Sequence, residues 1–177
     1  MRPSLALLTF LLANMWSPAL TAQTPAPESK QFDFWIGEWQ MHSKQRVAPG
    51  KDEWLEGAAA NSIKASFKGQ VIEEQFDGST LKQPFKGMSV SVYNPTLGNW
   101  KQTWVDDQGS YLDFVGEFKD DKMVLSRSFE QNGKSIHQRM VFKDIAKDSL
   151  TWHWERSMDG GKTWVLMWEL KYTRKAN

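Results

Sequence analysis

Arg127 is the charged residue whose neighbours in the sequence most clearly suggest chemistry. It alternates with Leu125 and Phe129, so on a β-strand the three side chains would share one face. A guanidinium on an inward, apolar face needs a carboxylate or an anionic ligand as its partner. We therefore expect Arg127 to orient the polar end of a bound molecule. The alternative is an internal pair with an acid of the barrel, such as Asp113 or Glu155.

Two glutamines have similar surroundings. Gln102 lies between Trp100 and Trp104, and Gln138 lies between Ile136 and Met140. A cavity with aromatic walls and a few fixed polar groups is typical of a small-molecule site. The residues that we expect to line such a cavity are Trp100, Gln102, Trp104, Phe114, Arg127, Met140 and Trp168.

The other titratable residues form no recognisable catalytic or metal-binding motif. The adjacent acids Glu73 and Glu74 would point to opposite faces of a strand, so they do not make a general acid and base pair. His42, His137 and His153 are far apart in the sequence and lack the spacing of metal ligands. We predict no catalytic residue and no metal site.

Short alternating segments rich in Val, Phe, Tyr, Trp and Thr must position these residues. Turn signals separate them at intervals of roughly ten residues, including Asp77-Gly78, Asn132-Gly133 and Asp159-Gly160-Gly161. The pattern predicts an all-β fold of nine or ten antiparallel strands. We expect an up-and-down barrel rather than a sandwich, because closure removes exposed strand edges. Residues 50–70 have the weakest strand pattern, and Gly57 to Ala60 would also suit a short helix.

The segment Ser157-x-Asp159-x-Gly161-x-Thr163-Trp164 matches the Asp-box pattern of sialidase-like propellers. A propeller needs many such blades, and this chain has one copy. Asp159 would accept hydrogen bonds from backbone amides in the turn. We interpret the segment as a structural hairpin.

The N-terminus predicts export. Residues 1–22 combine Arg2, the apolar segment 5–13 and the small residues Leu20-Thr21-Ala22, as a cleavable signal peptide does. We expect a mature chain from Gln23, with 23–30 as a flexible N-terminus and 31–175 as one barrel domain. No stable membrane insertion is expected after cleavage. The predicted location is a bacterial periplasm or the extracellular medium.

The composition limits the kinds of partner that the protein is expected to bind. Basic and acidic residues nearly balance, 22 against 21, and they alternate along the chain, which argues against nucleic acid as a partner. Cysteine is absent, so disulfides and thiolate sites are excluded. The sequence contains ten tryptophans, which suit a core stabilised by burial alone. It does not indicate an oligomeric state.

The segment Phe32-Asp33-Phe34-Trp35-Ile36-Gly37-Glu38-Trp39 resembles the opening of an uncharacterised family of exported bacterial calycin-like domains. Its Gly-x-Trp step is similar to the signature of the lipocalin and calycin superfamily. The resemblance implies a calycin-like barrel with a short N-terminal helical plug. It also implies that Trp39 lies at the closed end beneath an arginine of the last strand, which would be Arg174. Gly37, Trp39 and Arg174 would then close the barrel.

Nitrobindins share this general architecture and bind haem through an interior histidine. By that resemblance His153, between Trp152 and Trp154, is the candidate for a haem alternative. Alternation along the strand places it on the face opposite those tryptophans. We therefore predict no cofactor and keep haem as the alternative.

These observations predict non-catalytic binding of a small hydrophobic or amphipathic molecule inside an exported barrel. One alternative is an enzyme on the same barrel that acts on a lipid-like or glycan-like substrate, which would require titratable groups with shifted pKa values inside. The other is an envelope interaction module with a packed core and exposed aromatic residues such as Trp54.

Overall fold

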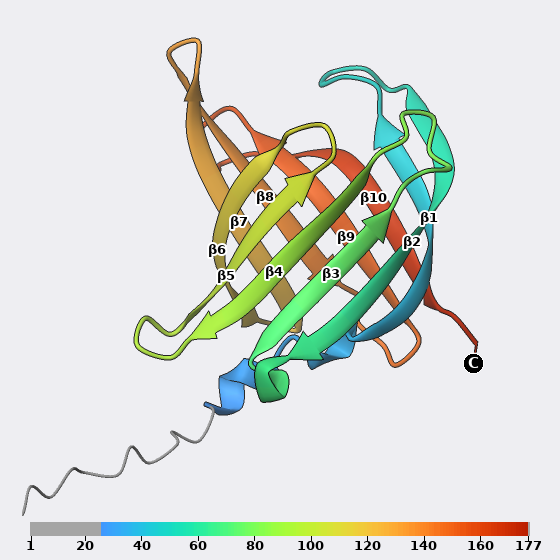
Figure 1. Ribbon diagram of the computed structural model, residues 1–177. Coiled ribbons are helices and arrows are strands. Elements are labelled where there is room, and N and C mark those ends of the chain that lie inside the picture. The colour runs from blue at the N-terminus through green and yellow to red at the C-terminus, as the bar shows by residue number, and fades with distance from the viewer. Residues whose placement is uncertain (1–25, 177) are drawn as a thin grey trace, which may run out of the picture.

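The computed structural model describes residues 26–176, so the predicted signal peptide lies outside the described residues. Ten antiparallel strands form a closed barrel in the order β1-β10-β9-β8-β7-β6-β5-β4-β3-β2 (Figure 1). The strands are β1 (Gly37–Arg46), β2 (Trp54–Ser66), β3 (Val71–Asp77), β4 (Lys86–Asn94), β5 (Asn99–Asp106), β6 (Tyr111–Lys119), β7 (Lys122–Gln131), β8 (Lys134–Lys143), β9 (Ser149–Ser157) and β10 (Val165–Arg174). The predicted all-β, calycin-like barrel is confirmed.

Turn chemistry places the hairpins where the sequence predicts them. Asn132 and Gly133 connect β7 to β8 with φ values of +52° and +70°. Two successive positive φ values match the twist of a tight antiparallel hairpin, and Asn-Gly adopts them at little cost. The local sequence therefore sets the register of this pair.

Gly57 to Ala60 belong to strand β2, so the prediction of a possible short helix there is wrong. Strand β2 runs for 13 residues and pairs with β1 on one side and β3 on the other. Ala59, Asn61 and Ile63 alternate as its buried positions. Neighbouring strands decide the outcome, because residues with a weak strand preference follow the pairing that surrounds them.

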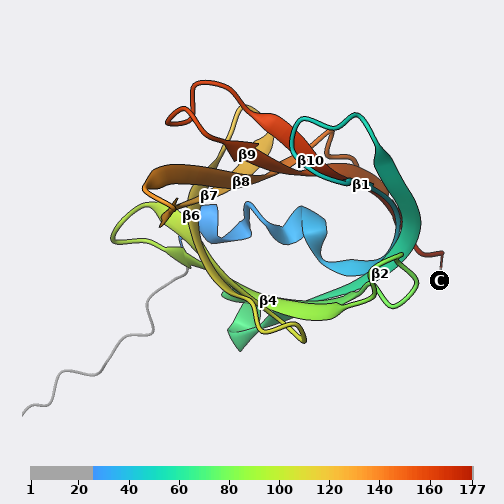
Figure 2. The same cartoon turned by 90° about the horizontal axis from the view of Figure 1, so that it is seen from above.

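A short plug closes one end of the barrel. It consists of the 3-10 turns η1 (Pro27–Lys30) and η2 (Asp33–Trp35); a third 3-10 turn, η3 (Phe67–Gly69), connects β2 to β3 at the same end (Figure 1). Seen from above, the plug lies within the ring of strands (Figure 2). We expected residues 23–30 to be flexible, whereas 27–30 form η1 and bury Ser29.

The plug is held by aromatic contacts with the barrel wall. The Phe32 ring stacks on Trp35 at 5.0 Å and meets Trp100 and Phe142 edge-on at 5.3 and 5.0 Å. Edge-to-face aromatic pairs add to the stabilisation from burial. The opposite end of the barrel carries the loops after β1, β3, β5, β7 and β9, and we call it the open end (Figure 1).

Strand β10 departs from simple alternation. Its register with β9 shifts between Leu166 and Trp168, so Leu166 lies opposite Glu155 while Trp168 lies opposite Trp154. The sequence predicts one long strand that carries Trp164, Leu166 and Trp168 on one face. The strand instead begins at Val165, and its bulge moves Leu166 off the face of Trp168.

Candidate functional site

A cavity of about 290 Å³ extends from Trp35 of the plug towards the open end. Its walls include aromatic side chains of the strands and of the loop before β4: Phe76, Phe85, Trp104, Phe114, Trp152, Trp154 and Trp168. Phe76 meets Trp104 and Trp168 edge-on, each at 5.9 Å. These rings hold one another in place and leave space between them, as in a preformed ligand site.

A polar cluster lines the same cavity and is built around Glu74 of β3. The Glu74 side chain is 6% exposed. Asn61 Nδ2 donates to Glu74 Oε1 at 2.7 Å, and Ser89 Oγ donates to Oε2 at 2.6 Å. Asn61 Nδ2 also lies 3.2 Å from the Tyr172 hydroxyl oxygen, to which it donates. Glu74 and Tyr172 both line the cavity.

Gln102 extends this cluster. Its Nε2 donates to Ser91 Oγ at 2.9 Å and to Ser89 Oγ at 3.2 Å. Because Ser89 gives its own hydrogen to Glu74, its oxygen accepts from the amide nitrogen of Gln102. The amide nitrogen is therefore engaged with β4, and Gln102 offers the cavity its carbonyl oxygen, which is an acceptor.

Burial raises the pKa of Glu74 from 4.5 to about 7, although the hydrogen bonds from Ser89 and Asn61 act to lower it. Burial and the nearby Glu74 carboxylate likewise raise the pKa of Tyr172 well above its usual range. Tyr172 is therefore a neutral phenol at ordinary pH, whereas Glu74 changes its charge near neutrality.

A second polar group lies towards the open end. Arg156 of β9 and Gln138 of β8 are register partners and both line the cavity. Arg156 Nη2 donates to Gln131 Oε1 at 3.2 Å, whereas its buried Nε has no partner among the described residues. A buried donor without an acceptor is costly, so it is suited to an acceptor supplied by a ligand.

The structure places the predicted lining residues as follows. Gln102, Trp104, Phe114, Met140 and Trp168 line the cavity. Trp100 faces inward but packs against Phe32 of the plug, and its Nε1 donates to Gln31 Oε1 at 3.2 Å. Their role in binding a ligand stays a prediction.

Arg127 is half-buried beside the cavity, next to the lining residue Gln138. Its Nη1 lies 3.5 Å from Gln138 Oε1, and its guanidinium packs over the rings of Phe129 at 4.7 Å and Phe114 at 5.9 Å. It forms no ion pair with Asp113 or Glu155: Asp113 accepts from Thr103, and Glu155 pairs with Arg139. Among the described residues no acid neutralises Arg127.

Arg174 stabilises the end of the barrel that the plug closes. Its guanidinium carbon lies 4.0 Å from the centre of the Trp39 ring, and Nη1 donates to the Ile36 carbonyl at 2.8 Å. Gly37 has φ +138°, and a Cβ there would overlap the Arg174 guanidinium. The three residues that the calycin resemblance singles out are thus in contact.

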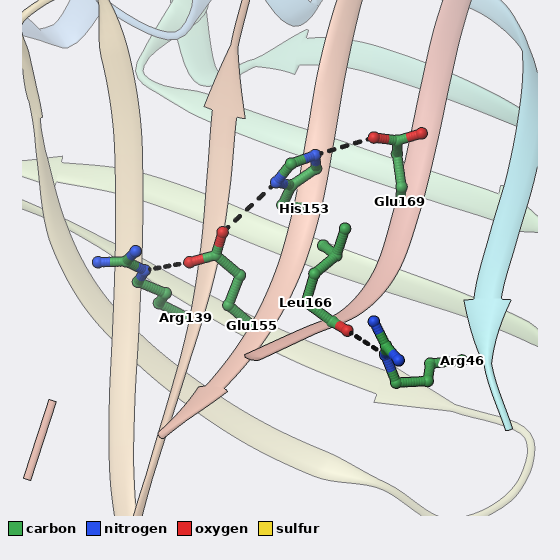
Figure 3. Close-up of polar contacts among 6 residues, drawn as sticks. All are labelled: Arg46, Arg139, His153, Glu155, Leu166 and Glu169. Carbon is green, nitrogen blue, oxygen red and sulfur yellow. Dashed lines mark hydrogen bonds and ion pairs between the residues drawn. The ribbon is translucent and has the colours of Figure 1, made fainter. Parts of the chain in front are cut away.

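His153 does not line the cavity. It lies on the outer face of β9, with Nδ1 3.4 Å from Glu155 Oε1 and Nε2 3.1 Å from Glu169 Oε2 (Figure 3). Arg139 donates to Glu155 at 2.6 Å and completes this chain of polar contacts. Both ring nitrogens are occupied outside the barrel, so the haem alternative based on an interior His153 does not fit this geometry.

The Asp-box segment forms a hairpin loop. Asp159 Oδ1 accepts hydrogen bonds from the backbone amides of Lys162 and Thr163 at 3.0 and 2.9 Å, and Trp164 Nε1 donates to the Gly161 carbonyl at 2.9 Å. The Thr163 and Ser157 hydroxyls also bond to Asp159, and together these contacts hold its pKa well below the usual range. The segment therefore forms the hairpin that the sequence predicts.

Residues 26–176 contain no cluster of three or more His, Cys, Asp or Glu side chains suited to a metal ion. The same residues include no helix long and apolar enough to cross a membrane.

A protein-family model described as "Protein of unknown function (DUF1579)" matches residues 24–174. The chain belongs to this family. No curated protein matched this chain.

Two solved structures resemble the DUF1579 barrel in fold. The crystal structure of Rv2717c from M. tuberculosis is 14% identical with a TM-score of 0.57, and the match covers 85% of this chain and 99% of that one. The S-type phycobiliprotein lyase CPES from Guillardia theta is 13% identical with a TM-score of 0.54, and the match covers 86% and 99%. At these identities the likeness extends to the fold alone.

Glu74, Tyr172 and Arg156 are among the cavity residues that the predicted lining set missed. The signal for Glu74 was its position between Ile72 and Phe76, which alternation places on one face. That signal was as clear as the one at Arg127. Asn61 contacts both Glu74 and Tyr172, and this meeting of residues 98 positions apart depends on barrel closure and cannot be read from local sequence.

Proposed function

We propose that this protein binds a small hydrophobic or amphipathic molecule non-catalytically inside its barrel. The observation that carries the proposal is the cavity of about 290 Å³, with aromatic walls, the Glu74 cluster within it and arginines towards its open end. A preformed apolar cavity with a few placed polar groups is the usual form of a small-molecule site. Because the similar phycobiliprotein lyase shares only the fold, the choice of ligand rests on the cavity itself.

Binding would be driven by burial of the ligand's apolar body against the tryptophan rings. Arg156, with its unpartnered buried Nε, would orient a polar or anionic end of the ligand towards the open end. Arg127 would assist indirectly, because it donates a hydrogen bond to the lining residue Gln138. Neither arginine requires a catalytic partner for this role.

The alternative of an enzyme on a lipid-like or glycan-like substrate is favoured by one observation. Glu74 and Tyr172 lie together inside the cavity, and the pKa of Glu74 is about 7, which suits a general acid or base. An enzyme should hydrolyse chromogenic acyl esters or glycosides, and Glu74→Gln should reduce that rate more than a hundredfold. If the protein binds these substrates but hydrolyses none of them, the result supports non-catalytic binding.

The packed interaction module agrees least with the structure. It requires a filled core, whereas the barrel contains a cavity. Its suggested contact residue, Trp54, is half-buried and lies under the guanidinium of Arg46 at 4.2 Å.

Blocking the cavity tests the proposed function. We expect 8-anilinonaphthalene-1-sulfonate to bind the protein with enhanced fluorescence and to quench the tryptophans. Leu112→Trp on β6 should fill part of the cavity and weaken this binding at least about tenfold. Val115→Trp is the matched control, because Val115 is exposed on the same strand. Equal affinity in both variants would place the probe outside the barrel and contradict the proposal.

We also propose that the protein works after export, in a periplasm or outside the cell. The support is the sequence of residues 1–22, with its basic start, apolar segment and small-residue site. Intact mass measurement of protein from a periplasmic fraction should give a chain that starts at Gln23. A full-length chain in the cytoplasmic fraction would contradict it.

A further inference from the structure

We propose that the region of the cavity around Glu74 binds an organic ammonium group, with Glu74 as its counter-ion and the neighbouring aromatic rings as its cage. This inference rests on the proposed function, because it names the chemistry of one end of the ligand. It assigns to the Glu74 cluster a role that neither the fold likeness nor the family match supplies.

The first support is a buried carboxyl without a cation. Glu74 receives hydrogen bonds on both oxygens, from Asn61 and Ser89, and both bonds favour its ionised form. Among the described residues, no lysine, arginine or histidine forms an ion pair with it, and no positive charge contributes to its pKa. Buried charges are normally paired, so a cation from outside the chain would complete the site.

The second support is the set of aromatic rings that line the same cavity as the Glu74 carboxyl. Phe76 lies two residues from Glu74 on the same inward face of β3 and meets Trp104 and Trp168 at centroid distances of 5.9 Å. Trp152 meets Trp168 at 5.3 Å. Electron-rich ring faces attract an ammonium group, and cages of several aromatic rings are a recurrent means of recognising ammonium groups.

The third support is that the indole N–H groups of Trp104 and Trp168 already have acceptors. Trp104 Nε1 donates to Asp106 Oδ2 at 3.0 Å, and Trp168 Nε1 donates to Ser43 Oγ at 2.8 Å. These two tryptophans therefore offer the cavity their rings rather than hydrogen-bond donors. An anionic group placed here would meet a carboxylate and ring faces, whereas a cation would find favourable contacts with both.

The groups that face Glu74 leave its charge uncompensated. Tyr172 from β10 is titratable, but burial raises its pKa and keeps it neutral. The neighbouring strands β2 and β4 present Asn61 and Ser89, which are uncharged. The charged side chains that line the same cavity belong to the strand ends at its open end: Arg46, Asp106 and Arg156.

The test compares two probes of equal size, 4-phenylbutylamine, which is cationic, and 4-phenylbutan-1-ol, which is neutral, by tryptophan quenching at pH 8. The unmodified protein should bind the amine at least about tenfold more tightly than the alcohol. Glu74→Gln should weaken amine binding about 30-fold and change alcohol binding by less than about twofold. Glu73→Gln is the matched control, because it removes the same charge from the outward neighbour on β3.

Amine affinity of the unmodified protein should also rise from pH 6 to pH 8 as Glu74 loses its proton, and Glu74→Gln should abolish this rise. Equal binding of amine and alcohol by the unmodified protein would overturn the ammonium site while leaving the proposed function intact. This comparison needs no variant, so a folding defect in Glu74→Gln cannot obscure it. Failure of both probes and of 8-anilinonaphthalene-1-sulfonate to bind would instead overturn the proposed function.

Discussion

At the scale of single residues, Glu74 is subject to two opposing effects. Removal from water favours its neutral form, whereas donors from Asn61 and Ser89 favour its charge. Desolvation is the larger effect, so its pKa rises to about 7. The protein therefore keeps an acid whose charge is costly in the absence of a partner, and this cost is measurable without knowing any ligand.

The first prediction concerns stability against pH. The folded pKa of Glu74 is about 7 and its ordinary value is 4.5. Between these values the folded state holds a proton that the unfolded state has released, so this contribution to stability is full below pH 4.5 and declines as pH rises towards 7. From pH 4.5 to pH 8 this group should lower the free energy of unfolding of the unmodified protein by about 3 kcal/mol. Glu74→Gln should not show this decrease. Urea unfolding of both proteins at several pH values measures it; identical pH dependence would contradict it.

The second prediction concerns the arginines near the open end. Arg156→Gln should weaken binding of 8-anilinonaphthalene-1-sulfonate about tenfold, because the sulfonate loses a charged donor. Arg127→Met should weaken it less, since Arg127 reaches the cavity through Gln138. Lys101→Met, which removes an exposed cation of β5, serves as control. If all three variants bind the probe as the unmodified protein does, the arginines are not part of the site.

At the scale of elements, alternation in the sequence grouped several residues of regular strands by face. It placed Gln102 and Trp104 of β5 correctly on the inner face, together with Phe114 and Met140. It failed at β10, because a bulge changes the inward set without a marker in composition. It also could not show how far along the barrel each inward residue lies, so Trp100 was predicted in the cavity although it packs against the plug.

The third prediction concerns the plug. Arg174→Ala should lower the free energy of unfolding by about 2 kcal/mol, because it removes the cation–π contact with Trp39 and the hydrogen bond to the Ile36 carbonyl. Lys171→Ala, at an exposed position of the same strand, should cost less than about 0.5 kcal/mol. Chemical denaturation checks both. Equal effects would show that the plug does not depend on Arg174.

At the scale of the whole molecule, strand number and barrel closure could be predicted because turn signals recur and closure removes edges. The polar cluster could not, since Asn61, Glu74 and Tyr172 come from β2, β3 and β10. Their meeting depends on the pairing of β1 with β10, which no local pattern encodes.

The fourth prediction is a test on the intact protein. Native mass spectrometry of protein purified without detergent from its own host should show an added mass of a small amphipathic molecule. Leu112→Trp should reduce the occupied fraction, since it fills part of the cavity. A bare mass for the unmodified protein, together with no probe binding, would contradict a carrier function.

The pairing of β1 with β10 has a consequence for the order of folding. Trp39 lies opposite Arg174, so the first strand finds one of its two partners in the last strand of the barrel. A growing chain that lacks β10 has two unpaired strand edges, and its plug lacks the contacts of Arg174. Contacts between distant segments also form slowly. The barrel can therefore close only after β10 has emerged. Until then its strand edges remain exposed, and chaperones can bind them.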